Sequence, residues 1–141
     1  MIESKLDENI FKNSRMPSAE KKNVCNFDYL NEAMGFKKDL VKGIMDVFLS
    51  QVPKDLHCIN EAVTKPDYAQ LKSCAHSMRS SVAVMGISVL TPVLLEMEEL
   101  GRAEPAPDRK QTERLRELNT TFGLICRQAI QEIECELHNF G

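Results

Sequence analysis

One histidine of the chain lies between two basic residues at helical spacing. His76 follows Lys72 by four positions and precedes Arg79 by three, so on a helix these side chains share one stripe. Ser80 and Ala83 continue the stripe with small side chains that leave the imidazole accessible. A neutral imidazole is a good nucleophile near neutral pH, and nearby cations disfavour imidazolium and offset the charge of a phosphoryl group. The spacing therefore suits a phosphoryl carrier, with His76 as the candidate acceptor and the other four residues supporting it.

An ordinary solvated helix face gives the same pattern when none of its residues has a specific role. Histidine, lysine and arginine are common on exposed helix faces, because charged residues keep their contact with water. From the spacing alone, the stripe around His76 therefore has two interpretations, a phosphoryl site and an unspecialised surface.

The element that carries His76 is predicted to be a helix with one apolar face. Apolar residues recur there every three or four positions, and Gly86 follows the last of them as a helix end. The members of this face are Leu71, Cys74, Ala75, Met78, Val82 and Met85. His76 and Arg79 fall beside the face, so we expect them to be exposed on a rigid element.

Similar apolar spacing predicts one short helix and three more long helices. They cover residues 27–34, 40–63, 88–100 and 108–138. Gly35 ends the short helix, and Asp108 with Gln111 forms a capping box before the last one. Amphipathic helices must bury their apolar faces against one another. The sequence therefore predicts an all-α fold, an antiparallel up-down four-helix bundle with the short N-terminal helix across one end.

The chain divides into two unequal parts. Residues 1–23 are polar, with helical spacing only at Ile2, Leu6 and Ile10. We expect this segment to be loosely ordered or to form a short helix. Residues 24–141 contain the predicted bundle.

Composition and charge exclude several functional classes. The chain has 141 residues, enough for one domain, and its net charge of −3 lacks the basic excess of a nucleic-acid-binding protein. No stretch approaches the roughly 20 apolar residues that span a bilayer, and the N-terminus does not resemble a secretory signal. We therefore expect a cytoplasmic protein that binds neither nucleic acid nor membrane.

The cysteines and the acidic clusters have ordinary interpretations. Five cysteines are present without a Cys-x-x-Cys pair, which predicts neither a disulfide framework nor a zinc site. Small core positions are expected for Cys58, Cys74 and Cys126, and exposed helix faces are expected for Glu96, Glu98, Glu99, Glu132 and Glu134. Because these carboxylates show no cleft, acid-base catalysis is not expected.

Residues 75–86 resemble a known signature. They begin Ala-His-Ser-Met-Arg-Ser-Ser and end at Gly86. This is similar to the signature of the histidine-containing phosphotransfer (HPt) family, Ala-His-x-Leu-Lys-Gly followed by Ser or Ala and, a few residues later, Gly. The Leu- and Glu-rich residues 94–100 and the order of the helices also fit, and the resemblance covers residues 26–138. It implies a helical bundle.

The resemblance implies roles for individual residues. His76 matches the phosphorylated histidine, and Arg79 matches the basic residue, usually lysine, near the phosphoryl group. Ser80 stands where the family has glycine, so its hydroxymethyl group either crowds the site or hydrogen-bonds the ring or the phosphoryl oxygens. Val84 and Ile87 are the apolar residues expected in a docking face for the partner.

The family also implies a partner that supplies the rest of the chemistry. A response-regulator receiver domain or a hybrid sensor histidine kinase is the expected partner, and the receiver brings an aspartate and Mg²⁺. We therefore expect no cofactor and no metal on this chain, which would be a monomeric phosphoryl carrier dependent on its partner. Two alternatives stay open: a receiver-binding module without transfer activity, and an unrelated helical-bundle scaffold.

Overall fold

The computed structural model describes residues 23–102 and 108–140, and every regular element in them is an α-helix. The helices are α2 (Phe27–Ala33), α3 (Lys38–Thr64), α4 (Tyr68–Val84), α5 (Leu90–Gly101) and α6 (Arg109–Phe140). The predicted all-α fold is confirmed. The predicted polar segment at residues 1–23 lies outside the described residues, apart from Asn23.

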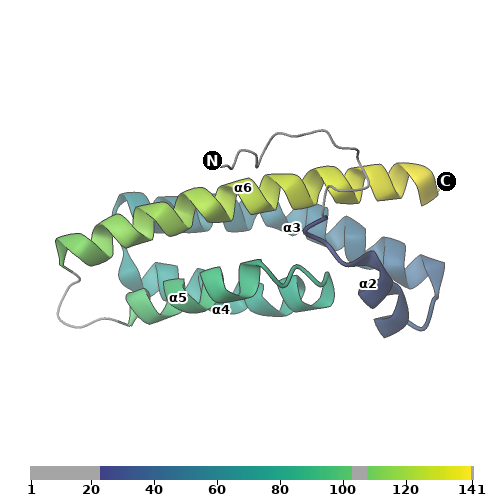
Figure 1. Cartoon of the computed structure of the whole chain (residues 1–141), viewed down its shortest axis with the longest axis horizontal. Helices are drawn as coiled ribbons and strands as arrows, with labels where there is room; N and C mark the ends of the chain where they lie inside the picture. Colours follow the sequence, from purple (N-terminus) through teal and green to yellow (C-terminus); the bar gives the residue numbers. More distant parts are fainter. Residues whose placement is uncertain (1–22, 103–107, 141) are drawn as a thin grey trace, which may run out of the picture.

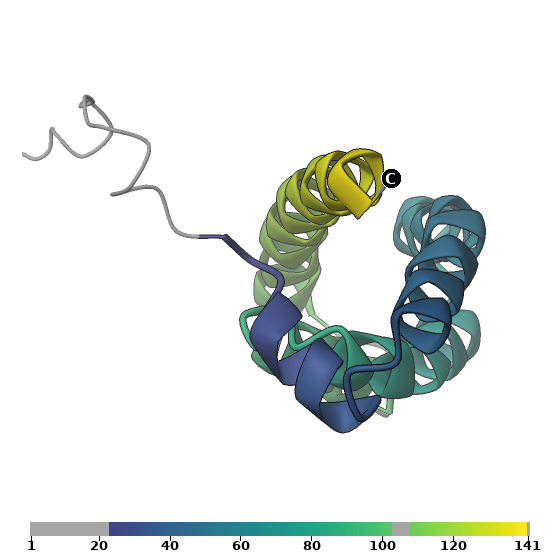
Figure 2. The same ribbon diagram turned by 90° about the vertical axis from the view of Figure 1, so that its right-hand side faces the viewer.

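The four longer helices form a ring around a common core. Within the described ranges, α4 packs against α3 and α5, and α6 closes the ring by packing against the same two helices. Figure 1 shows successive helices running in alternating directions, and Figure 2 shows them from one end. The largest side chains buried inside the ring include Met45, Ile59, Leu71, Met78, Leu94 and Phe122. Burial of these apolar faces is the main favourable term in folding.

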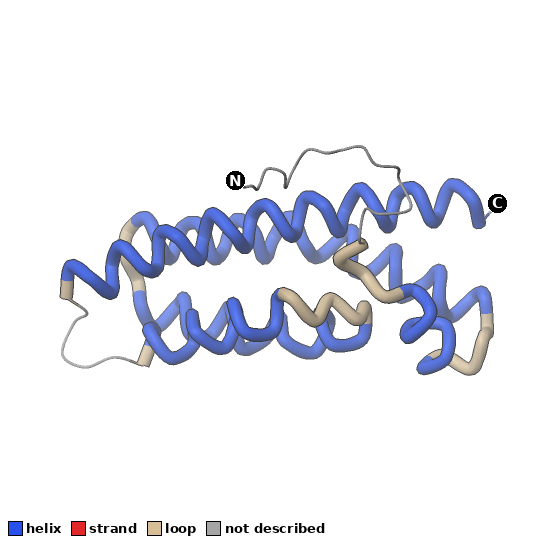
Figure 3. Tube along the Cα trace, in the orientation of Figure 1, coloured by secondary structure: helices blue, strands red, loops and turns tan. Residues whose placement is uncertain are grey.

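The end of α4 positions the short helix α2. Gly86 has a φ of +67°, and a Cβ there would lie 2.7 Å from the Cβ of Asn26. The backbone N–H of Asn26 donates to the carbonyl of Met85 at 3.2 Å, so the start of α2 packs directly on this turn. The predicted helix ends at Gly35 and Gly86 are confirmed, because both adopt the left-handed conformation that glycine tolerates best. Figure 3 shows how short the loops are that join α2 to α3, α3 to α4 and α4 to α5.

The start of α6 has the predicted capping box. The Asp108 carboxylate accepts from the backbone N–H of Gln111 at 2.9 Å, and the Gln111 side chain accepts from the backbone N–H of Asp108 at 2.9 Å. Two N–H groups that have no partner within the helix are thereby satisfied.

A buried carboxylate on α6 holds the segment that precedes α2. Glu132 is only 9% exposed and accepts from the backbone N–H groups of Val24 at 2.8 Å and Cys25 at 2.9 Å. The side chain of Gln128 also donates to it, at 2.8 Å. The expectation that Glu132 covers a solvated face is wrong, because backbone N–H groups buried at this point need an acceptor. Glu134 is exposed, as expected.

Two cysteines depart from the sequence prediction. Cys58 of α3 and Cys74 of α4 form a disulfide, with a Cα–Cα distance of 6.5 Å. Cys74 is buried as predicted and Cys58 packs against the core, but the pairing was not expected. The packing of α3 against α4 brings the two positions together, and spacing along the sequence does not show it. Cys126 is buried, as expected.

Candidate functional site

His76 lies in the middle of α4 and points toward solvent. Its side chain is 66% exposed, and Arg79, one turn later, is 39% exposed. Lys72, Ser80 and Ala83 are exposed on the same helix. The structure thus brings the five predicted site residues onto the outer side of α4, with small side chains around the imidazole.

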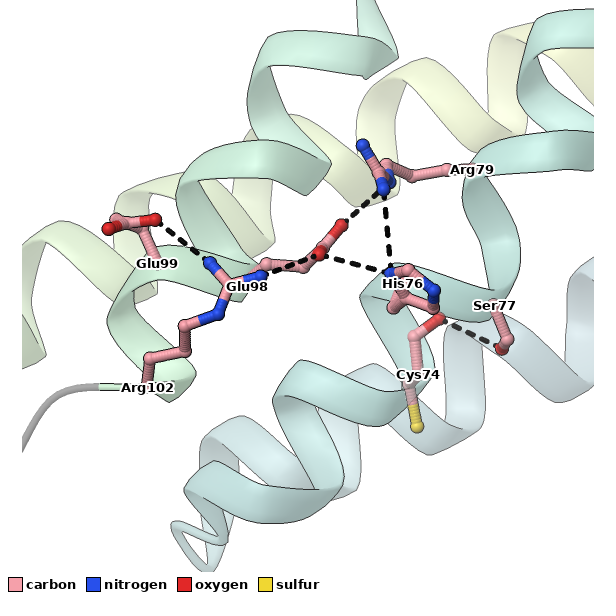
Figure 4. Close-up of polar contacts among 7 residues, drawn as sticks. All are labelled: Cys74, His76, Ser77, Arg79, Glu98, Glu99 and Arg102. Atoms are coloured by element: carbon pink, nitrogen blue, oxygen red, sulfur yellow. Dashed lines mark hydrogen bonds and ion pairs between the residues drawn. The ribbon is translucent and has the colours of Figure 1, made fainter.

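A carboxylate outside the predicted set of site residues lies against the imidazole. Glu98 of α5 is 2% exposed, and its Oε1 lies 3.3 Å from Nδ1 of His76. Its Oε2 lies 2.8 Å from Nε of Arg79, and a terminal guanidinium nitrogen of Arg102 lies 3.5 Å from Oε1. Figure 4 shows Glu98 reaching from α5 toward His76 and Arg79, both of which project from α4.

Two arginines balance the charge of the buried Glu98. A buried carboxylate is costly unless cations or hydrogen-bond donors compensate it. Arg79 supplies an ion pair that is not aligned as a hydrogen bond, since its Nε and the facing Glu98 oxygen have no hydrogen-bond partner. Arg102 hydrogen-bonds Glu98 at 3.5 Å and the exposed Glu99 at 3.0 Å. The imidazole therefore lies at the edge of a network whose charges largely cancel.

The contact with Glu98 favours one tautomer of His76. A carboxylate can only accept, so the 3.3 Å contact is a hydrogen bond when Nδ1 carries the proton. The Arg79 guanidinium also approaches Nδ1, but at the longer distance of 3.5 Å. Hydrogen bonds from the described part of the chain reach this ring only at Nδ1. The Nε2 lone pair is then free on an exposed ring, as a nucleophile requires.

A glycine allows α5 to approach α4 closely beside this network. A Cβ on Gly101 would lie 2.8 Å from the backbone oxygen of Tyr68 and 2.8 Å from the Cβ of Lys72. Gly101 stands one turn after Glu98 on α5, and Lys72 stands one turn before His76 on α4. The close contact therefore fixes the helix separation that brings Glu98 within reach of the imidazole.

The expectation that Glu98 lies on an exposed face is wrong. Glu99 is 76% exposed, but Glu98 belongs to the buried face of α5. The sequence contained a signal, because Glu98 follows Leu94 by four positions and Leu90 by eight, which places it on the apolar stripe. A carboxylate in such a stripe indicates a partner on a facing helix.

An apolar groove adjoins the histidine helix on its α3 side. It is lined by Ile44, Val47, Phe48, Gln51, Ser80, Ser81, Val84 and Met85. Val84, which we expected in a docking face, is part of it, whereas Ile87 is fully buried and cannot contact a partner directly. Ile87 folds inward because its N–H donates to the carbonyl of Val82 at 3.0 Å, which closes the turn after α4 over an apolar contact.

The described ranges contain neither a membrane span nor a metal cluster. No helix in them is long and apolar enough to cross a membrane. No group of three or more histidine, cysteine, aspartate or glutamate side chains in them could hold a metal ion.

The comparisons with known proteins agree with this geometry. The family model described as "Hpt domain" matches residues 43–134, which is more than half of the chain and includes His76, Arg79 and Glu98. The chain belongs to the Hpt domain family. Searches of curated proteins and of solved structures find no match. Family membership connects the chain with histidine phosphotransfer in two-component signalling and with receiver domains and kinases as partners.

Proposed function

We propose that this Hpt domain relays a phosphoryl group through Nε2 of His76, between receiver-domain aspartates or from a sensor kinase. The observation that carries the proposal is the contact of the buried Glu98 carboxylate with Nδ1 of the exposed imidazole. Because Nδ1 holds its proton toward Glu98, the opposite nitrogen presents a lone pair to an incoming partner.

The transfer step follows from this arrangement. The Nε2 lone pair attacks the phosphorus of the partner's aspartyl phosphate, the bond between phosphorus and the carboxylate oxygen breaks, and the aspartate leaves as a carboxylate. The imidazole gains positive character as the N–P bond forms, and the Nδ1–H hydrogen bond to Glu98 stabilises that charge. The reverse step returns the phosphoryl group to an aspartate by the same route.

Three cations belong to the candidate site or adjoin it. Lys72 and Arg79 flank His76 on α4, and Arg102, directly after α5, approaches Glu98. Arg79 and Arg102 already neutralise Glu98, so the carboxylate repels the phosphoryl oxygens less than an isolated charge would. The same cations would meet the acidic pocket of a receiver domain, where complementary charge speeds encounter and fixes orientation.

The partner supplies the remaining chemistry. We propose that the receiver domain brings the aspartate and the Mg²⁺ that phosphoryl transfer requires, and that this chain contributes no metal or cofactor. We further propose that the protein is monomeric and cytoplasmic, which fits a carrier that must reach several partners in turn.

The partner docks, in this proposal, on the α3 side of His76. Val47, which lines the groove together with Ser80 and Val84, is 66% exposed, and Leu40, seven positions earlier on α3, is 49% exposed. Phe36, just before α3, is 70% exposed and has a φ of +60°. An exposed phenylalanine in a left-handed conformation is unusual, and such backbone strain concentrates at functional positions.

Transfer from a phosphorylated receiver tests the proposal. The purified protein should acquire a label that is labile in acid and stable in base, and His76→Gln should abolish it. His57→Gln, which changes an exposed histidine on α3, should keep full labelling. Undiminished labelling of the His76→Gln variant, or no labelling by any cognate receiver, would contradict the proposal.

A module that binds receivers without transferring phosphate remains the second candidate. Ser80, which stands in place of the family's glycine at the edge of the groove, is the observation that favours it. Receiver binding that persists in His76→Ala, without a transferable label on the wild-type protein, would support this candidate. The third alternative, an unrelated scaffold, disagrees with the family match.

A further inference from the structure

Two helices of the bundle are joined by the Cys58–Cys74 disulfide. Cys58 lies on α3 and Cys74 lies on α4, two residues before His76, and their Cα atoms are 6.5 Å apart. That separation lies within the range that disulfides span without backbone movement. Figure 4 shows the Cys74 sulfur pointing away from the His76 ring, so the bond does not occupy the histidine site.

The two cysteines of the pair differ in exposure. Cys74 is 9% exposed, whereas Cys58 is only partly buried and therefore the more open of the two. The side-chain amide of Gln70 donates to the Cys58 carbonyl at 3.1 Å and lies 3.8 Å from its sulfur. A polar, partly open environment on one sulfur is typical of disulfides that form and break, rather than of sealed structural ones.

The remaining cysteines behave differently. Burial raises the pKa of the Cys25 thiol, as does its neighbour Glu132, and burial raises the pKa of Cys126 to about 12. Thiols with such pKa values are poor nucleophiles, because the thiolate is the reactive form. Cys135 is exposed on α6 and belongs to no pair within the described residues. Redox chemistry within one molecule therefore concentrates at Cys58 and Cys74.

We propose that Cys58 and Cys74 are a reversible redox modification site that clamps the histidine helix to α3. The oxidant is a peroxide. The Cys58 thiolate attacks one peroxide oxygen, the O–O bond breaks, and Cys58 becomes a sulfenic acid while one water leaves. The Cys74 sulfur then attacks the Cys58 sulfur, the S–O bond breaks, and a second water leaves. In total the two thiols lose two electrons and two protons, and the peroxide is reduced to two waters.

The clamp acts on the two helices that carry the candidate site. α4 holds His76 and α3 supplies the exposed apolar residues of the groove. A bond that closes a 16-residue separation lowers the entropy of the unfolded chain and restrains opening of α4 from α3. In a reducing compartment the pair is expected as free thiols, and an oxidising challenge would form the bond. Formation of the disulfide does not depend on whether His76 carries a phosphoryl group.

The test uses the full chain and three variants. Cys135→Ser removes the exposed competing thiol, Cys58→Ser breaks the pair, and Cys74→Ser breaks it from the other helix. Each protein is reduced with dithiothreitol, freed of reductant, and treated with hydrogen peroxide. Intact mass, a peptide map, thermal unfolding and amide hydrogen exchange of α4 are then measured.

The pair should respond as a unit. Cys135→Ser should lose the mass of two hydrogen atoms, and its peptide map should link Cys58 to Cys74. Its melting temperature should rise on the order of 10 °C on oxidation, α4 amides should exchange more slowly, and dithiothreitol should reverse these changes. Both variants that break the pair should lack the link and the shift, while melting near the reduced wild type.

Three outcomes would overturn the proposal. The first is the absence of a Cys58–Cys74 link after peroxide treatment. The second is a link that dithiothreitol does not reduce in the folded protein, which would make the bond a permanent structural one. The third is an unchanged melting temperature and unchanged α4 exchange on oxidation, which would show that the bond does not clamp the helix.

Discussion

At the scale of single residues, the chemistry depends on which groups touch the His76 ring. One ring nitrogen faces a buried carboxylate at 3.3 Å, and the other belongs to an imidazole that is two-thirds exposed. An isolated surface histidine interconverts freely between tautomers, whereas a fixed acceptor at Nδ1 keeps the proton on that side. In the proposed transfer, Glu98 is thus a positioning residue that acts through His76.

Removing the charge of Glu98 should slow transfer without preventing binding. Glu98→Gln retains an oxygen near Nδ1 but loses the negative charge, so we expect the transfer rate to fall roughly tenfold, the effect of losing a charge-assisted hydrogen bond. Receiver affinity should be unchanged. Single-turnover transfer and equilibrium binding measure the two effects.

Glu99→Gln is the matched control for this prediction. Glu99 is the neighbouring carboxylate, is 76% exposed and pairs only with Arg102 in the described ion pairs. The Glu99→Gln variant should transfer the phosphoryl group at the wild-type rate. Equal rates for Glu98→Gln and wild type would show that the carboxylate does not assist the imidazole.

In the proposed docking mode, Ser80 limits how closely a partner approaches. The residue is exposed at the edge of the groove, one turn after His76. Ser80→Gly should keep transfer, whereas Ser80→Leu should block receiver docking because a branched side chain fills the approach to the imidazole. Titration of each variant with a receiver domain measures the loss. Normal transfer by Ser80→Leu would show that the docking face is elsewhere.

At the scale of helices, the separation of α4 and α5 controls the site. The backbone oxygen of Tyr68 limits how large residue 101 can be, because a Cβ there would lie 2.8 Å from it. A backbone atom cannot move aside as a flexible side chain can, so a larger residue displaces α5 as a whole.

Gly101→Ala should therefore lower both the stability of the fold and the rate of phosphoryl transfer. We expect a loss of about 1–3 kcal/mol in the free energy of unfolding, typical of an overpacked contact. Transfer should slow as well, because Glu98 moves with α5. Urea unfolding and single-turnover transfer provide the measurements.

Gly43→Ala is the control for the helix substitution. Gly43 lies inside α3, and a Cβ there meets nothing within 4 Å. Alanine should raise the free energy of unfolding by about 0.5–1 kcal/mol, because it restricts the unfolded chain and favours helix. If both glycine variants were more stable than wild type, the close approach of α5 to α4 would not limit the size of residue 101.

At the scale of the whole molecule, the bundle is completed by a contact between distant parts of the chain. Glu132 near the end of α6 accepts from the backbone of Val24 and Cys25, 108 and 107 positions away. This contact holds the segment before α2 against α6, and it buries the Cys25 thiol, whose sulfur lies 3.9 Å from the carbonyl of Ala129.

Loss of this contact should release Val24 and Cys25 from α6. Glu132→Ala leaves two backbone donors without their acceptor, so we expect the free energy of unfolding to fall by about 1.5–3 kcal/mol. Cys25 should then react faster with iodoacetamide, because the burial that raises its pKa is lost. Glu134→Ala, on the exposed side of α6, should change neither quantity. Unaltered Cys25 reactivity in Glu132→Ala would mean that other contacts hold the segment.

The sequence by itself determined the helices and the placement of His76. Apolar spacing, the Asp108–Gln111 capping box and the two glycine helix ends depend on residues a few positions apart, so they could be identified without tertiary information. The stripe beside the apolar face placed His76 and its neighbours on the exposed side of α4 for the same reason.

Only the tertiary structure decided which residues meet across helices. The contact of Glu98 with His76, the pairing of Cys58 with Cys74 and the burial of Glu132 each join different elements. Their distances depend on how the helices are rotated and spaced, which local periodicity does not specify. The sequence therefore placed His76 on an exposed helix face, and the packing of α5 on α4 brings the Glu98 carboxylate to its Nδ1.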